Sequence, residues 1–332
     1  MISKTIEKCV GIVTPSTPAP ALFPERYNRG KKQLTDLGFK IIESKFATTI
    51  DGCVAASAKN RANDIMSLYD NSKIDFVIAS LGGNYSAEVL PYIDWMLIQK
   101  HKKILIGYSD ITILLIAFGV KGKQVSFYGP TLMTEFAEYP SAPKYSIESF
   151  CNALARKNLT ITPVLSLYSD GTDWALPPTR RELTCVVNQR VIRSGICSGT
   201  VIGGCVESLS RLRGTEYWPC FKDAILLLET SKDEFNEFSW RSLLVDYKNM
   251  GVFDEVSGII IGQKKWSDAN IDILQTLFLE FTKDRHIPIL YGLPFGHISP
   301  IATLPLFARA TLDADKMTLI YDDGLHFSYN ER

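Results

Sequence analysis

The sequence predicts an α/β protein in two parts, a doubly wound, parallel-stranded N-terminal domain and a smaller mixed α/β C-terminal domain. The first observation is that short apolar runs rich in β-branched residues recur through the first 130 residues without polar alternation. Helix-like segments separate these runs, a pattern typical of parallel strands buried on both faces. The second is the length of 332 residues, which corresponds to about two domains of ~150 residues each.

The N-terminal strands are expected in four apolar runs. The first run ends at Thr14-Pro15, and the second follows a helical pattern that Gly38 stops. The four expected strands span residues 9–13, 39–42, 75–79 and 104–107. The helices expected between and after them span residues 56–70, 86–99 and 111–118. This alternation of strands and helices indicates a doubly wound sheet.

A segment rich in turn signals separates the two halves. Residues 137–183 contain Tyr139-Pro140, Asp170-Gly171 and Pro177-Pro178, which are typical of turns and linkers. One helix is expected inside this segment, near residues 146–156. We therefore assign residues 1–165 to the N-terminal domain, 166–185 to a linker and 186–332 to the C-terminal domain.

The C-terminal half reads as mixed α/β structure. It begins with a β-like stretch rich in Gly, Ser and Val and ends in an alternating segment typical of closing β structure. The β-like stretch spans residues 186–202, and the alternating segment spans residues 308–321. The expected strands between them span residues 224–228, 256–261 and 287–291, and the expected helices span residues 239–250 and 268–282.

The charge balance excludes some partners. Lys plus Arg and Asp plus Glu both number 36, so the net charge is zero. Such a chain lacks the positive field that binds nucleic acid polymers or anionic membranes. Residues 1–20 have no apolar signal core, and the seven cysteines form no CxxC pair, which is typical of reduced thiols. We expect a cytoplasmic protein that binds neither a membrane nor a nucleic acid polymer.

Chemistry is expected at the carboxyl ends of the parallel strands, where open α/β sheets bind ligands. Gly82-Gly83 follows the strand at 75–79. Two glycines allow positive φ and let backbone N–H groups approach a ligand. This pair is either a cradle for an anion or oxyanion, or only a tight strand-to-helix turn.

A serine follows the next strand, in Gly107-Tyr108-Ser109-Asp110. A sharp turn there exposes the Ser109 hydroxyl at a helix N-terminus, where backbone N–H groups favour developing negative charge. The segment is similar to the nucleophile elbow G-x-S-x-G, except that Ile111 replaces the second glycine. The alternative is that Ser109 or Asp110 merely caps the helix.

Two more strand ends carry candidate residues. Glu229 ends the strongly apolar strand at 224–228; it either orients a histidine or simply marks the exit of the strand into water. His297 lies in a loop fixed by glycine and proline, and such a loop can hold a general base. The other histidines, His101, His286 and His326, read as surface residues. One serine, one glutamate and one histidine suffice for nucleophilic hydrolysis.

The common metal and cofactor motifs are missing from the sequence. It has no H-E-x-x-H, no cysteine pair at zinc spacing, no P-loop and no G-x-G-x-x-G after the first strand. We therefore expect no metal and no cofactor.

Several segments together resemble the LD-carboxypeptidase family of serine peptidases, and most closely its microcin C immunity branch. The Gly-Tyr-Ser-Asp and Gly-His segments, in this order, are the most specific of them. The matching segments are residues 11–16, Gly82-Gly83 with 90–94, 106–112, 128–130, Gly203-Gly204 with 212–215, 226–229 and 292–297.

The resemblance implies a catalytic triad of Ser109 as nucleophile, His297 as general base and Glu229 as the residue that orients the base. It also implies an oxyanion hole formed by the backbone N–H groups of Gly83 and Asp110. The implied fold is a Rossmann-like N-terminal domain with a smaller C-terminal α/β domain that carries the glutamate and the histidine. Members of the family are commonly homodimers, and we expect the same here.

The chain departs from the family at positions that bear on substrate. The murein-cleaving branch usually has an arginine before the two glycines, where this chain has Leu81. The immunity branch tends to have an Asn-Ser pair after them, whereas Tyr85 here separates Asn84 from Ser86. Asn84, at this position, is a candidate substrate-binding residue. Trp174 lies where the immunity branch has an aromatic residue that stacks on a nucleobase; the alternative is that it packs between domains.

The expected function is that of a serine carboxypeptidase-type amide hydrolase. Its expected substrate is a small peptide or an aminoacyl-nucleotide such as microcin C, cleaved for self-immunity or detoxification. One alternative is a murein LD-carboxypeptidase that releases terminal D-Ala from tetrapeptides. The other is a catalytically silent binding protein that uses the same cleft.

Overall fold

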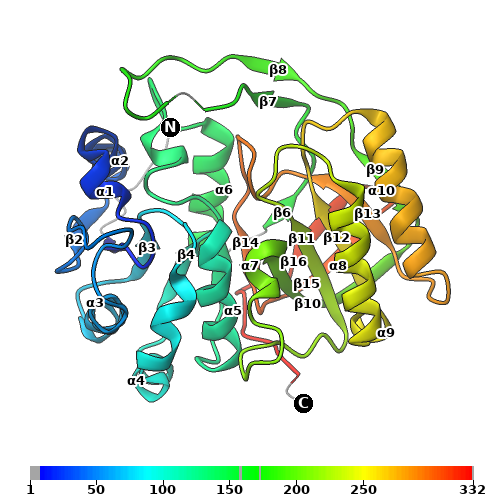
Figure 1. Cartoon of the computed structure of the whole chain (residues 1–332), viewed down its shortest axis with the longest axis horizontal. Coiled ribbons are helices and arrows are strands. Elements are labelled where there is room, and N and C mark those ends of the chain that lie inside the picture. Colours follow the sequence, from blue (N-terminus) through cyan, green and yellow to red (C-terminus); the bar gives the residue numbers. More distant parts are fainter. Residues whose placement is uncertain (1–7, 157–158, 172, 331–332) are drawn as a thin grey trace.

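The computed structural model describes residues 8–156, 159–171 and 173–330, and places two main sheets side by side with helices around them (Figure 1). Residues 1–7, part of the segment expected to lack a signal core, lie outside the described residues. So does residue 172 of the expected linker.

The N-terminal sheet has the strand order β14-β5-β4-β3-β1-β2. Strands β1 to β5 pair in parallel, and β1, β3 and β4 are buried along their whole length. The parallel strands are β1 (Cys9–Val13), β2 (Lys40–Glu43), β3 (Phe76–Ala79), β4 (Ile104–Gly107) and β5 (Ser126–Tyr128). The predicted parallel sheet is confirmed. Strand β5 was not expected, because its three residues are too short a run to give a periodic signal.

The helices of this half surround the sheet. They are α1 (Ala19–Leu22), α2 (Pro24–Asp36), α3 (Ala58–Asp70), α4 (Trp95–Lys100), α5 (Thr112–Val120) and α6 (Lys144–Ala155), with the 3₁₀ turns η1 (Ser86–Tyr92), η2 (Ser109–Ile111) and η3 (Glu135–Ala137). The single helix predicted at 86–99 was wrong. Pro91 lies inside η1, and proline removes a backbone donor that a longer α-helix needs. Asp94 then starts α4 by accepting hydrogen bonds from the Met96 and Leu97 N–H groups.

Helix α5 lies between the two halves (Figure 1). Residues 112–119 are all buried, because the helix contacts β4, β5 and β14 on one side and β10 (Ile196–Cys205) on the other. A helix that is apolar all round is stable only when it is covered all round. Ser109, just before this helix, is therefore held at the junction of the two sheets.

The C-terminal sheet has the strand order β6-β16-β15-β10-β11-β12-β13-β9. The centre of this sheet is parallel and consists of β10, β11 (Ala224–Glu229), β12 (Gly258–Gly262) and β13 (Ile289–Leu293). The outer strands pair antiparallel; they are β6 (Thr160–Ile161), β9 (Arg190–Arg193), β15 (Arg309–Asp313) and β16 (Thr318–Tyr321). The mixed α/β domain is confirmed. The β-like stretch expected at 186–202 contains β9 and the first part of β10, and Gly195, with φ of 134°, lies between these two strands. The helices are α7 (Val206–Ser210), α8 (Glu237–Asn249), α9 (Val252–Glu255) and α10 (Asp268–Phe281).

Each sheet takes one strand from the other half of the sequence. Strand β14 (Leu304–Leu306), far along the chain, pairs with β5 in the N-terminal sheet. Strand β6, which precedes the expected linker, pairs with β16 in the C-terminal sheet. The expected linker at 166–185 contributes β7 (Ser166–Tyr168) and β8 (Leu183–Cys185), which pair with each other and cross the top of the molecule in Figure 1.

The described residues contain no helix with both the length and the apolar character needed to cross a bilayer. All seven cysteines are free thiols.

Candidate active site

Ser109 lies on a strained turn directly after β4. Its φ is 63°, in the left-handed region that a residue with a Cβ adopts only at a cost. Close packing holds the turn: a Cβ at Gly107 would lie 2.8 Å from Ile111 Cγ2, and one at Gly82 would lie 3.0 Å from Ser109 Cβ. Small residues on both sides thus allow a tight elbow that presents the serine side chain.

Three side chains from three distant segments form one hydrogen-bonded chain. Ser109 Oγ lies 3.0 Å from His297 Nε2. On the other side of the imidazole, Nδ1 lies 2.9 Å from Glu229 Oε2 and 3.2 Å from Oε1. A carboxylate only accepts hydrogen bonds, so this contact assigns the proton to Nδ1 and leaves Nε2 to accept from the serine hydroxyl. The residues from three of the four predicted strand ends therefore meet.

The Glu229 carboxylate is buried at the end of β11. Only 2% of the residue is exposed, so the alternative that it marks the exit of the strand into water is wrong. The His297 backbone N–H also donates to Oε2. A Cβ at Gly296, whose φ is 89°, would lie 2.4 Å from the Glu229 Cδ. Glycine is required there because the histidine loop passes directly against the carboxylate.

Tyr128 is a member of this network that the search for strand-end residues missed. Its hydroxyl donates to Glu229 Oε1 and also accepts from the Ser109 backbone N–H at 3.5 Å. Burial, together with the charge of Glu229, raises the pKa of Tyr128 well above its ordinary value. The phenol therefore stays neutral and remains a donor. The sequence signal was present only as the Tyr128-Gly129-Pro130 segment of the family resemblance.

The Asp110 carboxylate ties the glycine turn to the serine turn. The residue is fully buried, and its Oδ2 accepts from Ser16 Oγ at 2.7 Å and from the Tyr85 and Ser86 N–H groups at 2.9 Å each. Gly83 has φ of 148°, and a Cβ there would lie 2.1 Å from Thr17 Oγ1. The two predicted backbone donors, on Gly83 and Asp110, thus belong to turns that are packed against each other.

The helix-cap alternative for Ser109 and Asp110 does not hold in the described part of the chain. Helix α5 begins after Ile111 and has no side-chain cap. The Asp110 side chain instead serves the beginning of η1, and the Ser109 hydroxyl faces His297.

A cavity of about 460 Å³ opens beside His297. Its wall includes Tyr108, whose ring packs edge-on against the imidazole with the centroids 5.1 Å apart. Charged side chains of both signs line the rest, from Arg26 on α2 to Lys264 after β12. The cavity therefore suits a small polar ligand whose reacting bond lies near His297.

The two candidate substrate-binding residues lie in different places. Trp174 lines the cavity, with the Arg26 guanidinium 4.2 Å from its ring centroid and Phe23 packed edge-on at 5.6 Å. Asn84 is not part of the cavity wall as described. Its backbone and side-chain oxygens accept from the Arg211 guanidinium at 2.7 and 3.0 Å. Asn84 therefore joins the glycine turn to the segment after α7.

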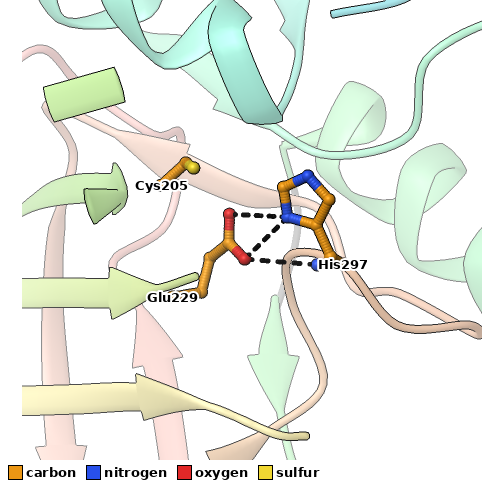
Figure 2. A group of neighbouring side chains, drawn as sticks. All are labelled: Cys205, Glu229 and His297. Atoms are coloured by element: carbon orange, nitrogen blue, oxygen red, sulfur yellow. Dashed lines mark hydrogen bonds and ion pairs between the residues drawn. The ribbon is translucent and has the colours of Figure 1, made fainter. Parts of the chain in front are cut away.

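One group of residues beside the Ser109–His297 hydrogen bond has a donor set that a metal could use. One ligand atom each from Cys205, Glu229 and His297 lies within 4.8 Å of the others. Figure 2 shows Glu229 between the other two, bonded to the imidazole. The Cys205 thiol donates to Glu207 at 3.1 Å, and burial raises its pKa well above the ordinary value. Zinc binding would require this thiol to ionise and the Glu229–His297 hydrogen bond to open.

Comparisons with known proteins give a family for this arrangement. Residues 10–129 match the LD-carboxypeptidase N-terminal domain, and residues 198–312 match the C-terminal domain. A carboxypeptidase homologue from Vibrio cholerae is 31% identical over 326 residues, 95% of each chain. The microcin C7 self-immunity protein MccF of Escherichia coli is 30% identical over 93% of this chain and 92% of its own length. A murein tetrapeptide carboxypeptidase of Pseudomonas aeruginosa is 25% identical over 80% of each chain.

The solved structures agree with this. Wild-type MccF without ligand superposes with a TM-score of 0.86 at 29% identity, over 97% of this chain and 98% of MccF. MccF has also been solved with glutamyl sulfamoyl guanosine and with aspartyl sulfamoyl adenosine. The chain therefore belongs to the LD-carboxypeptidase family and is a hydrolase of the carboxypeptidase class.

Proposed function

We propose that the chain is a serine-type carboxypeptidase with a catalytic triad of Ser109, His297 and Glu229. The observation that carries this proposal is the continuous hydrogen-bonded chain, 3.0 Å from Ser109 Oγ to His297 Nε2 and 2.9 Å from His297 Nδ1 to Glu229. Three residues so far apart in sequence meet in the geometry that nucleophilic hydrolysis needs.

The reaction follows from the roles of these groups. Ser109 Oγ attacks the scissile carbonyl while its proton passes to His297 Nε2, and the buried Glu229 stabilises the imidazolium. The backbone N–H groups of Gly83 and Asp110 stabilise the oxyanion that forms. His297 then gives its proton to the leaving nitrogen, the C–N bond breaks, and an acyl-Ser109 ester remains. A water molecule, deprotonated by His297, hydrolyses this ester and releases the acid.

The favoured substrate is a peptidyl- or aminoacyl-nucleotide of the microcin type. MccF, which binds aminoacyl sulfamoyl nucleosides, covers almost the whole chain in sequence and fold. Trp174 on the cavity wall supplies an aromatic surface next to a charged pocket, which suits a nucleobase joined to a polar acyl group. Stacking on the open side of its ring would place the base opposite Arg26.

A murein tetrapeptide is the second candidate substrate. A relative of that specificity is 25% identical over 80% of this chain, and a polar cavity also suits a short peptide. Incubating the protein with aspartyl sulfamoyl adenosine and with a muropeptide tetrapeptide, and following both by mass spectrometry, separates the two. We expect faster cleavage of the nucleotide; release of D-Ala alone would assign the murein activity.

A silent binding protein is the remaining alternative. A fluorophosphonate probe labels a serine only when its base is in place. We expect labelling of Ser109 in the folded protein and none in His297→Ala. A folded wild-type protein that stays unlabelled would overturn the hydrolytic proposal.

A further inference from the structure

Glu135 on η3 is a buried acid that the proposed mechanism does not use. Only 3% of the residue is exposed, and it lines the same cavity as His297. Its Oε2 accepts a hydrogen bond from Thr134 Oγ1 at 2.7 Å. A carboxylate at the wall of a ligand cavity is expected to have a charged partner, because burying a charge without one is costly.

The cations of this cavity already have partners. Arg26 and Arg181 both pair with Glu138, at 2.6 and 3.4 Å. The two lysines of the wall pair with aspartates: Lys264 with Asp233 at 3.0 Å and Lys265 with Asp170 at 2.7 Å.

Glu135 is thus left without an ion pair within the described residues. Among the described residues that line the cavity, one other carboxylate, that of Glu234, also has no ion pair. That residue is exposed, and water can solvate it. Glu135, in contrast, is almost entirely buried.

The pKa of Glu135 agrees with the lack of an ion pair at this residue. Burial raises the pKa of Glu135 from 4.5 to about 7, and the nearby Glu138 adds to the rise while Arg181 opposes it. The protein by itself therefore does not compensate for the charge of this carboxylate. A positive group on a ligand would do so.

Glu135 also lies close to the reacting groups. Burial raises the pKa of Tyr108 well above its ordinary value, and the charges of Glu135 and Glu229 add to the rise, so this phenol lies within the field of both acids. The Tyr108 ring in turn packs against His297. Glu135, Tyr108 and His297 all line the same cavity, so a ligand in it can reach both the acid and the proposed base.

We propose that Glu135 binds a free ammonium group on the acyl part of the substrate, close to the scissile carbonyl. The substrate class is then an aminoacyl amide with a free amine on the residue that is transferred to Ser109, because in a peptidyl amide that amine is already acylated. This inference rests on the proposed function, because it takes the cavity beside His297 as the acyl site.

The test compares one ligand in two forms, aspartyl sulfamoyl adenosine with its free amine and the same compound N-acetylated. Binding is measured by calorimetry in Ser109→Ala protein, which removes turnover, at about pH 7.5, where the amine and the acid both carry much of their charge. The same titrations are run with Glu135→Gln added. Glu234→Gln, the same charge change on the exposed acid of the cavity, is the matched control.

We expect the free amine to bind about ten to a hundred times more tightly than the acetylated form, as a charged hydrogen bond contributes. With Glu135→Gln, the ratio of the two affinities should fall to about threefold or less. With Glu234→Gln, this ratio should be the same as in the parent protein. An unchanged ratio in Glu135→Gln, equal binding of the two forms in the parent protein, or no binding of the free amine would each overturn the inference. The fluorophosphonate probe carries no ammonium group, so labelling of Ser109 tests the proposed function separately.

Discussion

The Tyr128 hydroxyl donates a hydrogen bond to the Glu229 carboxylate across the boundary between the two sheets. Tyr128 ends β5 of the N-terminal sheet, and Glu229 ends β11 of the C-terminal sheet. The same hydroxyl accepts from the Ser109 backbone N–H. One phenol thus connects the acid of the proposed triad with the turn that carries its nucleophile.

Replacing Tyr128 with phenylalanine should slow catalysis without abolishing it. The change removes one of the donors that hold Glu229, so we expect kcat to fall by about tenfold and the protein to lose about 1–2 kcal/mol of stability. Tyr69→Phe is a matched control, because Tyr69 is also buried and donates to the Lys103 carbonyl far from the site. That variant should lose similar stability and keep its kcat. Equal kcat values for the two variants would contradict a role of Tyr128 in positioning.

Two substitutions of Ser109 should differ in stability while both abolish turnover. Removing the nucleophile should cost about 10³-fold or more in kcat. Because Ser109 has φ of 63°, Ser109→Ala keeps the strained backbone, whereas Ser109→Gly relieves it by roughly 1 kcal/mol. Urea unfolding should therefore show Ser109→Gly to be at least as stable as Ser109→Ala. The opposite order would mean that the turn carries no strain, and activity in either variant would exclude Ser109 as the nucleophile.

The sequence could predict the parallel sheet and the strand ends because buried strands leave a direct signal. Runs such as residues 76–79 and 224–228 are apolar without polar alternation, and the residue that follows each is easy to find. The predicted helix at 86–99 failed at Pro91, where a local breaker outweighed a helical pattern.

The contacts across the sheets had no such signal. The exchange of β14 into the N-terminal sheet and the bond from Tyr128 to Glu229 depend on segments about a hundred or more residues apart. Periodicity reports what one segment buries, and says nothing about which distant segment covers it. The lack of an ion pair at Glu135 could not be predicted from the sequence for the same reason, because it depends on which acids the nearby cations pair with.

Glu229 and His297 should behave as one unit in mutant kinetics. Glu229→Gln keeps the size of the side chain and removes the charge that stabilises the imidazolium, so kcat should fall by several powers of ten. Adding His297→Ala should cause little further loss, since each change alone disables the same proton transfer. Measuring both single variants and the double variant decides the point. Independent losses that multiply would mean that the two residues do not form one catalytic unit.

Glu135→Gln should stabilise the protein at alkaline pH while it weakens ligand binding. The folded-state pKa of Glu135 is about 7 against an ordinary value of 4.5, so the folded protein holds this proton more tightly than the unfolded chain. Stability from this group is therefore lost as pH rises from about 4.5 to about 7, and the full cost remains above that window. Glutamine carries no such cost. In urea titrations at pH 8, the free energy of unfolding of Glu135→Gln should exceed that of the wild type by on the order of 2–3 kcal/mol. This difference should shrink towards pH 4.5. The exposed Glu234→Gln should show no such trend. A stability difference that is the same at both ends of this pH range would mean that burial does not strain the Glu135 carboxylate.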